Sequence, residues 1–374
     1  MRIVLTGADG FLGWHLRVRL WALTGHRVEI VNRHNWSELP DLVRETDAIL
    51  HVAGVNRGPD HEVEQGNIDL ALDVAAAVRK GPAGTRIVFA NSTQAGNGTA
   101  YGNGKAAAAD ILAELAHAGG GSCIDIRLPN LFGEHGRPGY NSFVATFVRA
   151  VIDGQEPSVV DRPVGLLHVQ DAAQVIIEAL TTQEKRLDPP PVPVTVAGVL
   201  DRLREFNGLY GAGGDIPRLS TALDVDLFNT LRAARFPDQY PIQLVPRTDN
   251  RGRLVETVRA HGSPGQTFVS TTKPGIVRGE HFHLRKIERF AVISGQARIS
   301  LRRMFSDRTV SFEVEGRNPV AVDMPTMWVH NIQNTGNDEL VTQFWTNELF
   351  DPENPDTYPE PVSVPAKDKV ASPC

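Results

Sequence analysis

Residues 1–16 read MRIVLTGADGFLGWHL, and this stretch decides the fold of the first part of the chain. A short apolar strand pattern at residues 2–6 runs directly into three glycines at three-residue spacing, and a helical pattern follows. Glycines at a strand-to-helix turn let the backbone approach a pyrophosphate, which then rests on the helix N-terminus. A purely structural turn is the alternative. The pattern predicts a dinucleotide site formed by Gly7, Gly10, Phe11, Leu12 and Gly13.

Outward from this stretch, strand-like and helix-like segments alternate to about residue 182. The runs RIVLTG, RVEIVNR, AILHVAG, RIVFANS and CIDIRLPN are short and apolar, with longer helical stretches between them. Such alternation predicts an α/β unit with a doubly wound, Rossmann-like parallel sheet. Three prolines at 189–191 interrupt the pattern, because proline cannot continue a helix. A helical region resumes at residue 197 and continues to about 236.

The pattern of predicted elements changes near residue 246. Runs such as RFAVISGQARISLRRM, TVSFEVEG and LVTQFW are strand patterns at short spacing, separated by turn residues. This pattern predicts an all-β sandwich or barrel. We therefore predict an α/β plus all-β chain, with a cofactor-binding domain and its helical lobe at 1–245 and a second domain at 246–374. The proline-rich tail from Asp351 is expected to be irregular.

The second predicted strand bears on the choice of cofactor. Dinucleotide folds often end this strand with a carboxylate that holds the ribose hydroxyls. Here it ends in Asn32 and Arg33. Without a carboxylate at this end, a 2′-phosphate is not repelled, and Arg33 can pair with it. The sequence therefore favours NADPH over NADH, with a solvated surface role for Arg33 as the alternative.

Tyr101 and Lys105 are four residues apart at the start of a predicted helix, so they share one face. A neighbouring ammonium is expected to lower the pKa of the phenol, which can then exchange a proton with a carbonyl or alcohol oxygen. Ser92, at the end of the strand RIVFANS, is placed to hydrogen-bond the same oxygen, with Thr93 as the rival hydroxyl. Ser92, Tyr101 and Lys105 are therefore the predicted catalytic residues.

Together, Ser92, YGNGK and GADGFLG resemble the extended short-chain dehydrogenase/reductase family, which acts on nucleotide sugars. The resemblance extends to DAILHVAG at 47–54 and HVQDAA at 168–173. It implies that Ala53 and Gly54 lie along the cofactor, that Asn67 supports the site, and that Pro129 and Asn130 lie near nicotinamide and substrate.

A second site is predicted near the end of the chain. His281 and His283 are two apart, so on a strand both point to one face. Glu288 follows after a turn, and His330 comes from a later strand. Three imidazoles and a carboxylate suit Zn, Fe, Ni or Mn, and the ligand types alone do not choose among them. We predict a divalent metal here, with zinc as the first candidate.

The spacing Gly275, His281, His283, Glu288, Gly295 resembles the first motif of the cupins, which are double-stranded β-barrels. The second cupin motif is partial: Pro325, His330 and Asn334 fit, whereas Met327 stands where glycine is usual. This departure is expected to narrow the pocket mouth. The alternative is a metal-free barrel that serves as a dimerisation module, and a homodimer is expected in either case.

A reductase of this family followed by a cupin resembles bifunctional enzymes of capsular polysaccharide synthesis. The resemblance implies NADPH-dependent reduction of the C4 ketone of a UDP-linked 2-acetamido-2,6-dideoxy sugar, after C3 epimerisation at the metal. The epimerisation base is open among His15, His261, several carboxylates and a zinc-bound water. The alternatives are a keto-sugar or nucleoside ketoreductase of a specialised pathway with an accessory cupin, and a cofactor-sensing scaffold.

Composition excludes some partners. The net charge is −6 without long Lys or Arg runs, which argues against nucleic acid. No apolar run approaches the ~20 residues of a membrane span. The N-terminus does not resemble a signal peptide. Two distant cysteines, Cys123 and Cys374, fit a reducing, cytoplasmic setting.

Overall fold

The computed structural model describes residues 1–363, so Cys374 lies outside the described residues. The chain divides into two compact units. The N-terminal unit comprises Met1–Thr146 and Val159–Gly198, and the C-terminal unit comprises Phe147–Ser158 and the chain from Val199 onward. Two helices, α5 (Phe143–Ile152) and α7 (Val196–Gly213), run from one unit into the other. Division of the two functions at residue 245 stays a prediction.

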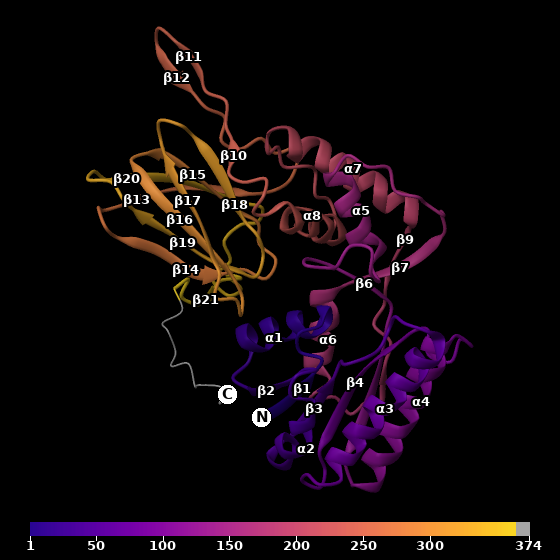
Figure 1. Cartoon of the computed structure of the whole chain (residues 1–374). Helices are drawn as coiled ribbons and strands as arrows, with labels where there is room; N and C mark the ends of the chain where they lie inside the picture. Colours follow the sequence, from indigo (N-terminus) through magenta and orange to yellow (C-terminus); the bar gives the residue numbers. More distant parts are fainter. Residues whose placement is uncertain (364–374) are drawn as a thin grey trace. The chain divides into compact units, whose positions relative to one another are not determined.

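A six-stranded sheet forms the centre of the N-terminal unit (Figure 1). Its order is β2-β1-β3-β4-β5-β8, and every neighbouring pair is parallel. The five predicted apolar runs form its first five strands, which confirms the α/β prediction. The strands are β1 (Arg2–Thr6), β2 (Arg27–Val31), β3 (Ala48–His51), β4 (Arg86–Ser92), β5 (Ser122–Leu128) and β8 (Arg186–Leu187).

Helices cover both faces of this sheet, which explains why its central strands β1 and β3 are buried and largely apolar. On one face, α1 (Phe11–Leu23) and α6 (Val169–Glu178) pack on alternate strand residues such as Leu5 and Leu50. On the other face, α3 (Asp60–Val78) and α4 (Ala100–Ala118) pack on the intervening residues, such as Val4 and Ile49. The sheet is therefore doubly wound, as predicted.

Shorter elements complete the N-terminal unit. Beyond the main sheet, β6, β7 and β9 form a three-stranded sheet in which β9 follows the prolines at 189–191. The elements are η1 (Trp36–Glu38), α2 (Leu39–Leu42), η2 (Val43–Glu45), β6 (Asn130–Phe132), β7 (Pro163–His168) and β9 (Val192–Thr195).

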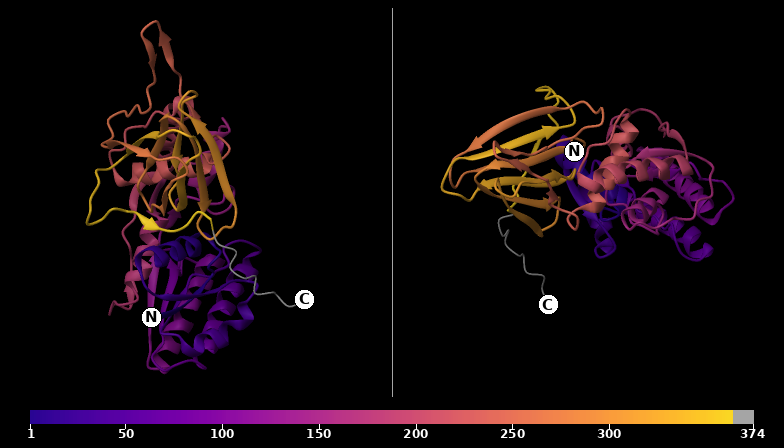
Figure 2. Two further views of the ribbon diagram at one scale, coloured as in Figure 1. Left: turned by 90° about the vertical axis from the view of Figure 1, so that its left-hand side faces the viewer. Right: turned by 90° about the horizontal axis from the view of Figure 1, so that it is seen from above.

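Two five-stranded antiparallel sheets form the centre of the C-terminal unit (Figure 2). They enclose an apolar core that includes Phe290, Leu301, Met324 and Phe344, which confirms the all-β prediction. The first sheet contains β10 (Ile242–Gln243), β18 (Val320–Met324), β15 (Glu288–Ser294), β20 (Leu340–Thr346) and β13 (Gln266–Thr272). The second contains β17 (Thr309–Glu315), β16 (Gln296–Arg303), β19 (Trp328–Asn334), β14 (Val277–Phe282) and β21 (Tyr358–Pro359).

A hairpin of β11 (Arg247–Asp249) and β12 (Gly252–Leu254) extends beyond these sheets (Figures 1 and 2). Helix α8 (Ala222–Arg235) also belongs to this unit. It begins with a capping box in which the Thr221 and Asp224 side chains bond each other's backbone N–H, a strong helix start signal.

A buried charge network joins the helices of the C-terminal unit to its first sheet. The Arg289 guanidinium donates to both carboxylate oxygens of Asp323, at 2.6 and 2.9 Å. Tyr210, on α7, donates to the same carboxylate at 2.7 Å. Arg232, on α8, donates to the carbonyl oxygen of Met324 at 2.8 Å. Polar contacts therefore tie α7 and α8 to β15 and β18.

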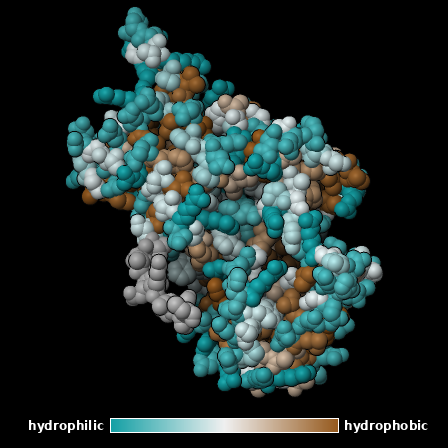
Figure 3. Space-filling view, viewed as in Figure 1, coloured by the Kyte–Doolittle hydropathy of each residue, from teal (hydrophilic) through white to brown (hydrophobic). Residues whose placement is uncertain are grey.

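Hydrophilic residues dominate the face shown in Figure 3, with apolar residues in small groups. Within residues 1–363, no helix combines the length and apolar character that crossing a bilayer requires.

Candidate functional site

Four loops at the carboxyl edge of the parallel sheet bring the predicted cofactor residues together. The glycine turn follows β1, Ala53 and Gly54 follow β3, Ser92 ends β4, and Pro129 follows β5. The chain goes from β1 to β2 on one side and to β3 on the other. Such a switch in strand order leaves a crevice at the carboxyl edge, where doubly wound folds bind ligands.

The glycine turn has two positions at which a side chain does not fit. Gly7 has a φ of +70°, and a Cβ there would lie 2.7 Å from the backbone of Ala53. A Cβ on Gly13 would lie 2.1 Å from the carbonyl oxygen of Gly7. Gly10 precedes α1 without a side-chain cap, so the first helical N–H groups are left for a ligand. Phe11 and Leu12, half-buried, begin the helix.

A carboxylate that the strand sequence does not reveal lies beside the end of β2. Asp9 comes from the glycine turn, and its side chain accepts hydrogen bonds from Asn32 at 2.8 Å and from Arg17 at 3.1 Å. Arg33, the predicted phosphate partner, is exposed. The expectation of no carboxylate near this strand end is therefore wrong, because the strand sequence alone does not show what the preceding turn places beside it. The two donors offset the charge of Asp9.

Ser92, Tyr101 and Lys105 gather where β4 meets the start of α4. Ser92 is buried and hydrogen-bonds the Tyr101 phenol, whereas Thr93 is exposed, so the geometry favours Ser92 over its rival. Burial raises the pKa of Tyr101, and the Ser92 hydrogen bond only partly opposes this. The expected lowering of this pKa is therefore wrong for the chain alone, because burial outweighs the Ser92 hydrogen bond. The phenol is held in its protonated, proton-donating form.

Lys105 lies fully inside this site. Its ammonium donates to the carbonyl oxygen of Ala90 at 2.6 Å and lies 4.1 Å from the Phe89 ring centroid. Burial lowers the pKa of Lys105 to about 7, although Asp125 acts in the opposite direction. A lysine with this pKa exchanges protons near neutral pH and can adjust the charge beside Tyr101.

Two further residues support the site. Asn67 donates to the carbonyl oxygens of Val55 and Val63, at 2.6 and 2.7 Å, and so holds the loop after β3 in place. His51, which the sequence argument did not single out, ends β3 with its Nδ1 2.7 Å from the hydroxyl of Thr6. Burial, followed by the charge of Lys105, lowers the pKa of His51 to about 3, so this imidazole is neutral.

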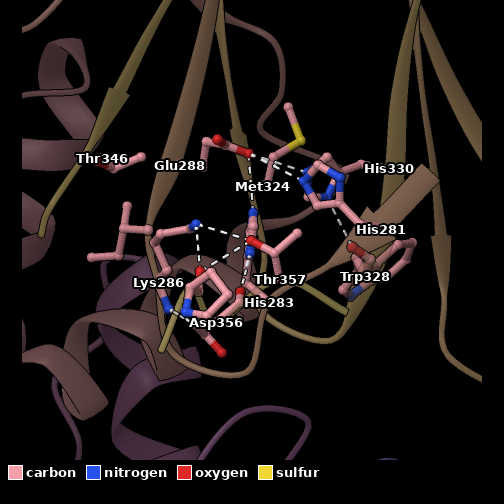
Figure 4. Close-up of polar contacts among 12 residues, drawn as sticks. His281, His283, Lys286, Glu288, Met324, Trp328, His330, Thr346, Asp356 and Thr357 are labelled. Atoms are coloured by element: carbon pink, nitrogen blue, oxygen red, sulfur yellow. Dashed lines mark hydrogen bonds and ion pairs between the residues drawn. The ribbon is translucent and has the colours of Figure 1, made fainter. Parts of the chain in front are cut away.

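The four predicted metal ligands converge in the C-terminal unit (Figure 4). His281 lies on β14, His283 directly follows that strand, Glu288 begins β15, and His330 lies on β19. The Oε2 atom of Glu288 lies 3.1, 3.2 and 4.0 Å from the Nε2 atoms of His283, His330 and His281. The His281 side chain is 22% exposed, against 8% or less for the other three, so solvent reaches the cluster on its side. We call these four residues the three-histidine cluster.

The other ring nitrogens face backbone carbonyl groups. His283 Nδ1 donates to the carbonyl oxygen of Asp356 at 2.6 Å, and His330 Nδ1 to that of Trp328 at 3.1 Å. His281 is hydrogen-bonded to the backbone of Gly279. Because Nδ1 of His283 and of His330 contacts a carbonyl oxygen, the Nε2 atoms of these two rings are the ones directed toward Glu288. Backbone partners of this kind commonly orient metal-ligating histidines.

The pKa shifts of His281, His330 and Glu288 also favour binding of a cation. Burial lowers the pKa of His281 to about 3, and the two neighbouring imidazoles act in the same direction. Burial also lowers the pKa of His330. Burial opposes ionisation of Glu288, yet its contacts with the His283 and His330 rings hold its pKa well below the usual range. Imidazole nitrogens around a carboxylate are the donor set that zinc and similar divalent metals take, so the residues fit the predicted metal.

Met327 occupies the position at which the cupin pattern has glycine. Its φ is +62°, a left-handed conformation that favours glycine, which gives a physical reason for the usual residue. Its N–H donates to the carbonyl oxygen of His283 at 2.7 Å, and its side chain is buried. The predicted narrowing of a pocket mouth stays a prediction.

Two of the candidate bases have partners elsewhere. His15 lies in the N-terminal unit, with its ring nitrogens 2.8 Å from the Glu134 carbonyl oxygen and 2.7 Å from the Gln170 amide. His261 lies in the C-terminal unit, 2.8 Å from Asp215. Neither belongs to the three-histidine cluster.

Comparison with known families agrees with this arrangement. Residues 3–192, half of the chain, match the model of the NAD dependent epimerase/dehydratase family. The chain belongs to this family. Membership implies a nicotinamide cofactor. Residues 247–358 match a second model, the polysaccharide biosynthesis C-terminal domain.

Individual relatives of this family member extend over both units. The UDP-2-acetamido-2,6-beta-L-arabino-hexul-4-ose reductase of Pseudomonas aeruginosa is 31% identical over 366 residues, which cover 96% of this chain and 98% of the relative. The crystal structure of the capsular polysaccharide assembling protein CapF from Staphylococcus aureus is 32% identical, with a TM-score of 0.60, and covers 97% of this chain and 100% of that one. UDP-glucose 4-epimerase from Thermotoga maritima, 16% identical over 63% of this chain and 99% of its own, shares the fold with a TM-score of 0.54.

Proposed function

We propose that this chain reduces the 4-keto group of a UDP-linked 2-acetamido-2,6-dideoxy hexose in its N-terminal unit, with NADPH as the reductant. The observation that carries the proposal is the meeting of Ser92, Tyr101 and Lys105 beside a glycine turn at the carboxyl edge of the sheet. The name of the Pseudomonas relative, a UDP-hexulose reductase that matches this chain end to end, supports the substrate class.

The protein groups supply the proton of this reaction. When bound, the nicotinamide supplies the hydride. As hydride reaches C4, negative charge develops on the former ketone oxygen, and the protonated phenol of Tyr101 donates to it. Ser92 holds the same oxygen by a hydrogen bond, and Lys105 stabilises the negative charge that Tyr101 acquires. The raised pKa of Tyr101 suits the reductive direction, because a protonated donor is needed.

The preference for NADPH rests on Arg33. Arg33 is exposed at the end of β2, where a 2′-phosphate of the cofactor would lie. Asp9 is bonded by Asn32 and Arg17, and these donors weaken its repulsion of a phosphate. A guanidinium pairs with phosphate through two parallel hydrogen bonds, which a hydroxyl cannot match.

We propose that the C-terminal unit is a cupin whose three-histidine cluster holds a divalent metal, zinc first, and that it epimerises C3 of the same 4-keto sugar. The chemistry that such a cation supplies is polarisation of a carbonyl, which acidifies the adjacent C–H group. The chain's own contribution is to present three Nε2 atoms and one carboxylate while leaving the His281 side open to a ligand. One ketone would thus activate C3 first and accept hydride second.

A single incubation tests both parts. The purified protein is supplied with NADPH and the UDP-linked 4-keto sugar in D2O, while NADPH absorbance is followed and the product is identified by NMR. Oxidation of NADPH together with deuterium at C3 is the expected result. Oxidation without deuterium would leave the alternative of a keto-sugar reductase with an accessory C-terminal domain, and no oxidation with any 4-keto sugar nucleotide would reject the proposal.

The predicted homodimer also stays a proposal. The edge strand β13 carries the exposed apolar residues Phe268 and Val269, which a second copy can cover. Light scattering on the purified chain measures the molecular mass directly; a monomer at micromolar concentration would contradict this expectation.

A further inference from the structure

The tail segment at residues 355–359 lies against the three-histidine cluster, although the cluster's ligands come from other parts of the chain (Figure 4). Strand β21 pairs with β14, with Tyr358 opposite Phe282 and Pro359 opposite His281. This pairing brings Asp356 next to the loop at 284–287, which joins His283 to Glu288. A stretch expected to be irregular thus has a fixed place beside the cluster.

The carboxylate of Asp356 accepts three consecutive backbone N–H groups. Leu284 donates to Oδ1 at 3.0 Å, and Arg285 and Lys286 donate to Oδ2 at 3.0 and 2.7 Å. Asp356 is only 2% exposed, and a buried carboxylate is costly unless such donors surround it. The next amide in the loop, that of Ile287, donates to the Asn347 side chain at 2.8 Å. Every amide between the two ligands is therefore bound by an acceptor side chain.

The main chain of Asp356 makes an independent contact with the cluster. Its carbonyl oxygen accepts the 2.6 Å hydrogen bond from His283 Nδ1. A carbonyl oxygen only accepts, so this contact requires the proton on Nδ1 and leaves Nε2 directed toward Glu288. The φ of Asp356 is +45°, a left-handed conformation that aspartate and asparagine tolerate better than most residues. The residue type therefore suits both the backbone and the carboxylate contacts.

We propose that Asp356 is a positioning residue for the metal site: its carboxylate fixes the loop that sets the His283–Glu288 separation, and its carbonyl group fixes the orientation of His283. The inference rests on the proposed function of the three-histidine cluster as a metal site. Neighbours of Asp356 hold Lys286 in the same way, since its ammonium donates to Pro355 O at 3.1 Å and to Thr357 Oγ1 at 3.3 Å. Residues on both sides of Asp356 therefore also hydrogen-bond to the loop.

Zinc affinity measured by competition with a chromophoric chelator tests this role on the full chain. In Asp356→Asn, one carboxylate oxygen becomes an NH2 group that faces backbone N–H donors, so the loop loses hydrogen bonds that hold it in place. Loss of an outer-shell partner typically weakens metal binding about 10- to 100-fold, and we expect a loss of this size. Asp356→Gly keeps the left-handed backbone but removes the carboxylate, and should show a similar loss. Glu353→Gln changes an exposed carboxylate of the same tail and should bind zinc as the wild type does.

The outcomes separate the two proposals. Failure of the wild-type chain to bind zinc would reject the metal site itself. Tight wild-type binding with an unchanged affinity in both Asp356 variants would reject only the positioning role. If the variants do not fold, 15N-histidine NMR of the zinc-loaded wild type decides instead: a slowly exchanging Nδ1–H proton on His283 is expected, and a rapidly exchanging one or an Nε2–H form overturns the proposal.

Discussion

The ammonium of Lys105 lies 2.6 Å from the carbonyl oxygen of Ala90. Lys105 follows Tyr101 by one turn of helix α4. The contact with Ala90 anchors the lysine at the end of β4, beside Ser92. Burial lowers the pKa of Lys105 and raises the pKa of Tyr101, so the environment disfavours the charged form of both side chains. The pair is therefore suited to donating a proton in a step that creates negative charge on a substrate.

Tyr101→Phe should lower the rate of NADPH-dependent reduction by a factor of about 10² to 10⁴, the usual contribution of a positioned general acid. Cofactor affinity, measured by fluorescence titration, should not change, because the phenol oxygen is not needed to bind the dinucleotide. The adjacent hydroxyls give a matched comparison: Ser92→Ala should also slow reduction, whereas the exposed Thr93 should tolerate alanine. Wild-type turnover in Tyr101→Phe would reject its assignment as the acid.

Arg33→Ala should raise the KM for NADPH about tenfold while leaving that for NADH unchanged, because only NADPH carries the 2′-phosphate that the guanidinium would bind. Arg27, exposed at the opposite end of β2, provides the control, and Arg27→Ala should alter neither constant. Steady-state kinetics with both cofactors checks the result. An equal change in KM for both cofactors would show that Arg33 does not bind the 2′-phosphate.

Acid stability should depend on His51. An imidazole in the unfolded chain titrates near its ordinary pKa of about 6.5, whereas in the fold this pKa is lowered to about 3. Between these values the unfolded state binds more protons, so the free energy of unfolding falls as pH decreases, by up to about 1.4 kcal/mol per pH unit. His51→Gln should flatten this dependence in urea unfolding between pH 6.5 and pH 3. His34→Gln changes an exposed histidine and should keep the wild-type slope; equal slopes in all three proteins would contradict the prediction.

Chelation of the metal should separate the two proposed activities. A strong chelator, or His281→Ala, should stop deuterium entering C3 and lower the melting temperature of the C-terminal unit, because bound metal stabilises the folded state by mass action. Reduction of an already epimerised 4-keto sugar should continue, since the reductase residues lie in the other unit. His261→Ala, which changes a histidine outside the cluster, should retain metal and exchange. Continued exchange in metal-free protein would place the epimerisation elsewhere.

Much of this organisation could be predicted because its signals are local. The glycine turn, the alternating strands and the spacing of His281, His283 and Glu288 each reflect geometry within a short stretch of chain. Contacts that depend on long-range packing could not be predicted from the sequence. Asp356 acts partly through its backbone carbonyl group, which every residue type has, so the sequence does not single it out. Asp9 contacts Asn32, just after β2, only in the folded chain. The raised pKa of Tyr101 depends on burial, which spacing along a helix does not show.

The Arg289–Asp323 pair should be among the most sensitive positions in the C-terminal unit. Both side chains are almost completely buried, so Arg289→Met takes from the Asp323 carboxylate its nearest cation and leaves it with Tyr210 and the more distant Arg232; breaking a buried pair typically costs about 3–5 kcal/mol. The exposed pair Arg298–Glu313, on neighbouring strands of the other sheet, is the matched control, and Arg298→Met should change the free energy of unfolding by less than about 1 kcal/mol. Replacing both members of the pair, with Asp323→Leu added, should recover little of the loss, because the buried guanidinium of Arg232 then loses the carboxylate that lies 3.9 Å from it. Urea unfolding of the four proteins measures these differences, and a loss in Arg289→Met no larger than in Arg298→Met would show that the buried network contributes little to stability.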